Sequence, residues 1–189
     1  VRVVIMLKNI SEKQSSILIS WIPVLSFLLL FSGVLLVKIS DYDLWWHLSL
    51  GKEVVKKGAL SLQDSFSHSF GGAEQFNGEW LSDLLMYGSY NLFGLPGVYL
   101  LKFTVMGLVF GGLYLITTLY YDKEQKIELA TAILSLIVVL FAIRFRLFIR
   151  PYLFSYLFFV YFLFVLCRAQ KGVRGPFFWG LLPIEILWA

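Results

Sequence analysis

Charged residues are scarce in this chain, and their scarcity narrows the class of protein. They account for 15% of the 189 residues, whereas hydrophobic residues account for 59% and aromatic residues for 18%. Soluble domains carry roughly 25% charged residues and are close to half apolar. The excess of apolar residues therefore predicts an integral membrane protein rather than a soluble domain with a larger core.

Cysteine and the signatures of soluble enzymes are also lacking. The single cysteine, Cys167, excludes an internal disulfide, and we expect it to be a small buried residue. The sequence has no Gly-x-Gly-x-x-Gly, Walker, Gly-x-Ser-x-Gly or His-Glu-x-x-His motif, which disfavours a nucleotide-binding activity in this segment. The net charge of +4 comes without a soluble basic face, so no nucleic-acid partner is expected.

What the chain does have is a series of long apolar runs. A helix needs roughly 20 apolar residues to cross a bilayer. The first run lacks the cleavage site of a signal peptide and is predicted to be a retained span. The predicted fold is an all-α polytopic membrane protein, a single membrane domain with about five transmembrane helices. The spans are expected at about 17–39, 95–121, 129–143, 152–167 and 176–189.

The fifth run is too short to cross a membrane. It holds about 13 residues after Pro176 and stops at Ala189 without a polar tail. We therefore expect a truncated helix and the N-terminal part of a longer protein, and whether this fragment is active alone stays open.

Basic residues predict the orientation, because they favour the cytoplasmic side of a span. The N-terminal segment and the loop at 168–174 are basic and are placed in the cytoplasm, whereas the acidic loop 40–94 is placed outside. The expected location is the inner (plasma) membrane. Arg144, Arg146 and Arg150 break the pattern by falling outside. They could neutralise the acidic loop, or they could bind an anionic substrate such as a phosphate.

The loop 40–94 is too long to be a simple connector, and two amphipathic interfacial helices are predicted in it. The first runs from Leu44 to about Lys57, capped by Asp43 or Ser40 and stopped by Gly58. Its apolar stripe is expected to comprise Trp46, Leu50, Val54 and the stem of Lys57, with His47 and Gly51 on the face of Asp43. The second opens near 77–81 and ends near 93–94.

The candidate chemistry lies at the start of this loop. Asp41 and Asp43 could hold a divalent cation such as Mg²⁺ or Mn²⁺, or one of them could act as a general base. His47, Glu79 and Trp80 are candidate substrate-binding residues, together with the three arginines. Each has a plainer interpretation: a solvated turn for the aspartates, a structural histidine, and a charge at a helix start for Glu79.

The segment Asp41-Tyr-Asp43-Leu-Trp-Trp-His47, followed by Gly51, resembles the acidic motif of the GT-C superfamily of membrane glycosyltransferases. The superfamily includes oligosaccharyltransferase catalytic subunits and protein O-mannosyltransferases. The segments at 64–67, 79–81 and 150–155 are similar to those of a bacterial branch, so the resemblance spans about 40–155. It implies an inverting hexosyl- or pentosyltransferase with a polyprenyl-phosphate-linked sugar as donor and an acceptor outside the cytoplasm. It also implies that Asp43 or Asp41 is the catalytic carboxylate and that the arginines face the donor phosphate.

Two interpretations of other classes stay open. A transporter or polysaccharide-export component would carry ionisable residues inside its spans, and Lys102 and Glu185 are the candidates in the apolar runs. A structural membrane subunit would use the loop 40–94 as a docking platform. We expect convergence of the carboxylates and arginines on one cavity in an enzyme, and their dispersal in a docking subunit.

Overall fold

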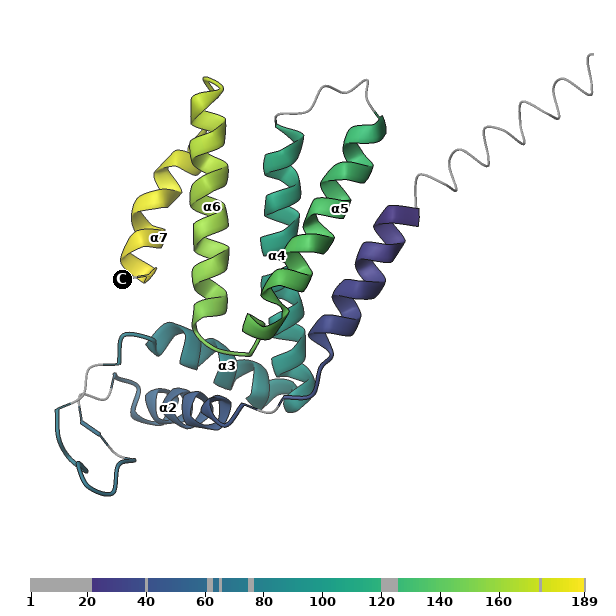
Figure 1. Cartoon of the computed structure of the whole chain (residues 1–189). Helices are drawn as coiled ribbons and strands as arrows, with labels where there is room; N and C mark the ends of the chain where they lie inside the picture. The colour runs from purple at the N-terminus through teal and green to yellow at the C-terminus, as the bar shows by residue number, and fades with distance from the viewer. Residues whose placement is uncertain are drawn as a thin grey trace, which may run out of the picture. The chain divides into compact units, whose positions relative to one another are not determined.

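In the part of the chain that the computed structural model describes, the named elements are all helices (Figure 1), and this confirms the all-α prediction. It describes residues 22–39, 41–60, 63–64, 66–74, 77–119, 126–173 and 175–188. An apolar helix, Ile22–Leu35, comes first. The later helices are α2 (Asp43–Lys57), α3 (Trp80–Phe93), α4 (Leu95–Thr118), α5 (Lys126–Ile143), η1 (Arg144–Arg146), α6 (Tyr152–Gln170), η2 (Pro176–Gly180) and α7 (Leu181–Trp188).

Two helices are long and apolar enough to cross a membrane, namely Leu95–Thr117 and Tyr152–Gln170. The apolar helices Ile22–Leu35 and Phe177–Ile186 are shorter. The expected ends of several spans, at 17–21, 120–121 and 189, lie outside the described residues. The described residues thus confirm two helices of spanning length and hydropathy, and not the predicted count of five.

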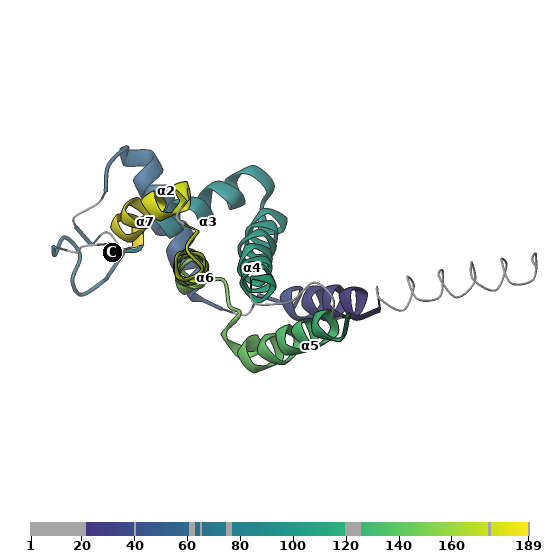
Figure 2. The same ribbon diagram turned by 90° about the horizontal axis from the view of Figure 1, so that it is seen from above.

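The chain separates into two compact units. The first comprises described residues 22–37 and 126–146, and the second comprises 38–119 and 147–188. In the first unit the helix Ile22–Leu35 lies beside α5 in both views (Figures 1 and 2). Phe31, Leu35, Ile133, Leu136 and Leu140 are buried there. The candidate site belongs mostly to the second unit.

In the second unit, α2 and α3 lie across the ends of α4 and α6 from which these two helices start (Figure 1). α3 packs against both α2 and α4, and α4 packs against α6. Gly112 allows the last contact, because a Cβ there would lie 2.6 Å from Cγ1 of Val160. A buried core ties together α2, α3, the start of α4 and the segment before α6 through Leu44, Leu48, Met86, Val98 and Ile149.

The ends of α2 and α3 follow local signals. Gly58 has φ of 65° and its N–H bonds to the carbonyl of Val54 at 2.9 Å, so it is the stop that was predicted. The predicted cap was wrong: Asp43 is the first helical residue, and its N–H instead bonds to Oδ1 of Asp41 at 3.2 Å. Ser40 lies outside the described residues. α3 occupies Trp80–Phe93, within a few residues of the prediction.

His47 and Gly51 share one face of α2, as predicted, and this buried face is a different one from the apolar stripe. Leu44, His47, Leu48 and Gly51 are buried, whereas Trp46 is 39% exposed. The reason is a close approach of two backbones, since a Cβ at Gly51 would lie 2.2 Å from the carbonyl oxygen of Asp83 in α3. Trp46 instead makes an edge contact with Phe66, at 5.3 Å between ring centroids.

The cysteine and the two ionisable residues of the apolar runs differ in their burial. Cys167 is free and only partly buried, so its predicted burial is found only in part. Glu185 is exposed on α7. Lys102 of α4 is buried, with 5% of its surface exposed.

Candidate active site

Asp41 and Asp43, at the start of α2, meet Arg150, at the start of α6. Nε of Arg150 donates to Oδ2 of Asp41 at 2.5 Å, and Nη2 donates to Oδ1 at 3.0 Å. Nη2 also lies 2.8 Å from Oδ2 of Asp43. We call these three residues the carboxylate–arginine cluster. They are separated by up to 109 positions in sequence, and the core of the second unit brings them together.

The pairing gives the two carboxylates different properties. The hydrogen bond from Arg150 holds the pKa of Asp41 below its usual value, and the same bond raises the pKa of Arg150. The side chain of Asp41 is 8% exposed, whereas that of Asp43 is 53% exposed. Asp41 is therefore an anchor for the guanidinium, and Asp43 is the carboxylate that is open to solvent.

Arg150 keeps part of its binding capacity. A guanidinium has five N–H donors, and the contacts with the aspartates use Nε and Nη2. No residue in the described ranges accepts a hydrogen bond from Nη1, and the side chain is 39% exposed. The geometry of this remaining end suits a phosphate oxygen.

A second polar group lies inside the contact between α2 and α3. Nδ1 of His47 donates to Oδ1 of Asp83 at 2.7 Å, and Nδ2 of Asn77 donates to Oδ2 at 2.7 Å. Asp83 is fully buried and His47 is 7% exposed. Oδ1 of Asn77 also accepts the N–H of Glu79 at 2.9 Å, which fixes the start of α3. The structure thus places His47 in a helix–helix contact, where its Nδ1 faces Asp83.

The sequence analysis assigned no role to Asp83. A signal for Asp83 was present, because Met86, Tyr87 and Tyr90 follow it at three, four and seven positions. This spacing puts the carboxylate on the packed face of α3, where Asp83 and Met86 are buried. A carboxylate there requires polar partners on the helix that covers it.

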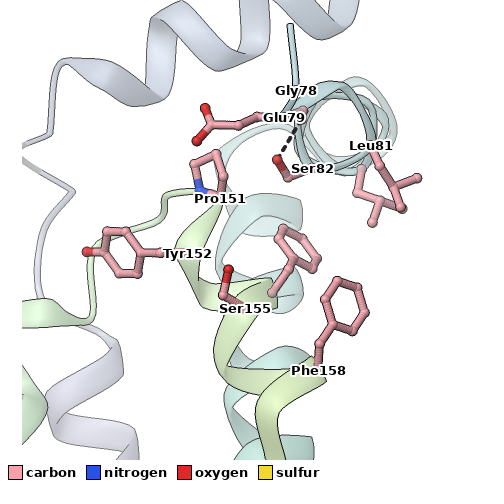
Figure 3. A pocket seen from close by; sticks show the side chains of 10 residues that line it. Gly78, Glu79, Leu81, Ser82, Pro151, Tyr152, Ser155 and Phe158 are labelled. Carbon is pink, nitrogen blue, oxygen red and sulfur yellow. Dashed lines mark hydrogen bonds between the residues drawn. The ribbon is translucent and has the colours of Figure 1, made fainter. Parts of the chain in front are cut away.

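A cavity of about 210 Å³ lies between the first turns of α3 and α6 (Figure 3). Glu79 lines it, as does Pro151, the residue directly after Arg150. Trp80 is partly buried and is not among the lining residues. Of the predicted substrate-binding residues, Glu79 therefore lines the cavity, and Arg150 is adjacent in sequence to a lining residue.

The other two arginines belong to the first unit. Arg144 and Arg146 form η1 and are exposed. The guanidinium of Arg144 lies over the ring of Phe145, at 4.5 Å from the centroid, and 5.8 Å from that of Phe141. Arg150 is the arginine that shares a unit with Asp41 and Asp43.

The ligand set for a divalent cation is incomplete in the part of the chain that is described. Both oxygens of Asp41 are bound by Arg150, whose positive charge disfavours a cation between the same carboxylates. No group of three or more His, Cys, Asp or Glu side chains in the described ranges could hold a metal ion. Mg²⁺ or Mn²⁺ at Asp41 and Asp43 stays a prediction, and no chemical step below is assigned to a metal.

Comparison with known proteins adds no relative from which a role could be transferred. No protein-family model matches the chain, and neither a curated protein nor a solved structure is significantly similar to it. Support for a function comes from the carboxylate–arginine cluster, the cavity and the helices that carry them.

Proposed function

We propose that the chain is the membrane part of a glycosyltransferase that takes a sugar from a polyprenyl-phosphate-linked donor. The acceptor is a lipid, glycan or protein outside the cytoplasm. The observation that carries this proposal is the contact of Arg150 with Asp41 and Asp43 at the end where both α4 and α6 start. A carboxylate that can accept a proton and a cation that can bind a phosphate lie side by side there.

Asp43 acts as the general base in this proposal. One of its oxygens pairs with Arg150, and in the described ranges no residue pairs with the other. The acceptor hydroxyl gives its proton to Asp43 as its oxygen bonds to the anomeric carbon of the sugar. The bond from that carbon to the phosphate oxygen breaks, and the lipid phosphate leaves with the electron pair. A single displacement of this kind inverts the anomeric centre.

Arg150 stabilises the charge that develops on the leaving phosphate. Its Nη1 end is directed away from the aspartates and is the part available to the substrate. Asp41 holds the guanidinium in a fixed orientation through two hydrogen bonds. A hydrogen-bond donor group that is oriented before the reaction stabilises a transition state without a reorganisation cost.

The proposed topology has five spans, a cytoplasmic N-terminus and an outer loop 40–94. α4 and α6 start at the same end of the second unit (Figure 1), so the chain between them has to return to that end. α5, with 18 residues, has a length of about 27 Å, close to the thickness of the hydrocarbon core. Trp45 and Trp46 are exposed on α2, as expected for a helix at headgroup depth.

The experiment is complementation of a strain that lacks the full-length gene, with the envelope glycans and glycolipids measured by mass spectrometry. Asp43→Asn is expected to abolish the sugar modification that the wild-type gene restores, at unchanged protein level. Glu74→Gln is the matched control, since Glu74 is an exposed carboxylate of the same loop. Full restoration by Asp43→Asn, or a deletion that changes no glycan or glycolipid, would contradict the proposal.

Specific observations also favour two other functions. Arg150 pairs with both aspartates and so holds the start of α2 to the start of α6, as a structural contact in a docking subunit would do. Lys102 is a buried ionisable residue in a helix of spanning length, which a transporter would use. A docking subunit predicts that Asp43→Asn leaves every envelope sugar unchanged. An export component predicts that the finished glycan accumulates inside the cell, whereas the enzyme predicts that it is not made.

A further inference from the structure

The cavity between α3 and α6 has two walls of different chemistry. Figure 3 shows the oxygen-bearing ends of Glu79, Tyr152 and Ser155 on one side of the view, and Leu81 and Phe158 on the other. Leu85 and Phe154 extend the apolar lining. A cavity with one polar and one apolar wall suits a compact ligand that is itself two-faced.

The polar wall offers both hydrogen-bond donors and acceptors. Oγ of Ser82 donates to the carbonyl of Glu79 at 2.7 Å, so its lone pairs can accept from a ligand. The carboxylate of Glu79 is exposed and makes no hydrogen bond with another residue of the described ranges. Ser155 adds a hydroxyl group from α6, whereas the hydroxyl of Tyr152 points away from the other labelled side chains (Figure 3). Closely spaced hydroxyls on a ligand would find partners along this wall.

The charge of the lining limits the kind of ligand. Glu79 is the charged side chain among the lining residues, and it would repel an anion held next to it. Arg150 directly precedes the lining residue Pro151 in sequence, and Arg150 itself does not line the cavity. A phosphate therefore belongs beside Arg150, and an uncharged group belongs inside the cavity.

We propose that this cavity binds the uncharged sugar ring of the donor and that Glu79 selects against a sugar that carries a carboxylate. The ring presents its C–H face to Leu85, Phe154 and Phe158 and its hydroxyls to the polar wall. This inference rests on the proposed function. It adds the location of the sugar and the residue that selects between uncharged and negatively charged sugars. Glu79 is a specificity residue here and takes no part in proton transfer.

The test measures binding of three synthetic lipids to the full-length protein in lipid nanodiscs. The probes are undecaprenyl phosphate, the same lipid carrying glucose and the same lipid carrying glucuronic acid. The wild-type protein is expected to prefer the glucose lipid to the glucuronic acid lipid by about tenfold, because a like charge placed beside Glu79 is costly. Glu79→Gln is expected to reduce this preference to about threefold or less, since it removes the charge and keeps the shape.

A second variant tests the location independently of charge. Ser155→Phe fills the cavity, so the advantage of the glucose lipid over bare undecaprenyl phosphate should disappear. The control is Ser89→Phe, because Ser89 lies on α3, does not line the cavity and bonds through Oγ to the carbonyl of Leu85. Binding of bare undecaprenyl phosphate reports that each variant is folded. If Ser155→Phe fails that check, Glu79→Gln decides.

The outcomes separate the two proposals. A wild-type protein that binds bare undecaprenyl phosphate but does not distinguish the two sugars overturns the sugar site and leaves the proposed function in place. The same holds if the preference for the glucose lipid survives in Glu79→Gln. A wild-type protein that binds none of the three lipids overturns the proposed function, and the sugar site with it.

Discussion

Replacing Asp83 with leucine should be among the most destabilising changes in the second unit. The substitution removes a fully buried carboxylate that accepts two hydrogen bonds of 2.7 Å, from His47 and from Asn77. It leaves both donors without their partner, and His47 remains 7% exposed with little access to water. Breaking a buried pair by removing one member costs about 3–5 kcal/mol, most of it from the polar groups left behind.

The assay is thermal unfolding of the purified full-length protein in detergent, followed by intrinsic fluorescence. A loss of this size corresponds to a fall in Tm of roughly 6–20 °C for a chain of this length. The matched control is Glu74→Gln, an exposed carboxylate whose loss should change stability by less than about 0.5 kcal/mol.

A double variant distinguishes orphaned polar groups from lost packing. His47→Leu combined with Asp83→Leu removes both partners of the His47–Asp83 hydrogen bond and replaces them with apolar groups. It should be more stable than Asp83→Leu alone, with a coupling of about 1–3 kcal/mol. If the two single changes simply add, or if Asp83→Leu costs less than about 1 kcal/mol, the hydrogen bonds do not stabilise the contact as inferred here.

Two further predictions concern the same unit. Gly51→Ala should destabilise by about 1–3 kcal/mol, because the new Cβ would lie 2.2 Å from the carbonyl oxygen of Asp83. Gly88→Ala, at a helical position of α3 with nothing within 4 Å, should instead stabilise by about 0.5–1 kcal/mol, and equal Tm shifts for the two would contradict the close approach. Asp41, whose pKa is lowered by Arg150, should contribute stability that is fully present above its ordinary value of 3.8 and lost as the pH falls through the lower, folded-state value. The Tm difference between wild type and Asp41→Asn should therefore shrink in acid, and a difference that grows there would refute the pairing.

The sequence predicts the parts of the fold that depend on neighbouring residues. Apolar periodicity and the glycine stop at Gly58 indicate α2 and α3 because each signal acts within a few turns of chain. The count of five spans is a different kind of statement, since it depends on lengths and end positions. Two helices of the described residues meet the criteria for a span.

The contacts between distant segments were harder to predict. His47 and Asp83 are 36 positions apart, and nothing local to either indicates the other. Helical spacing predicts the apolar stripe through Trp46, whereas the face of α2 that packs against α3 depends on the backbone contact at Gly51. Neutralisation of the acidic loop was one of the two roles considered for the arginines, and the contact of Arg150 with Asp41 agrees with it. The sequence did not indicate which arginine meets which aspartate.

The close contact of α2 with α3 determines when the conformational entropy of these two helices is lost. The cluster begins on α2 and the cavity begins on α3, and the buried bonds of Asp83 hold these two helices at one separation. The spacing between Asp43 and the cavity is therefore fixed once, when the chain folds. In the proposed enzyme, a substrate that arrives later would meet a preorganised surface and would lose less entropy than one that has to gather mobile loops around itself.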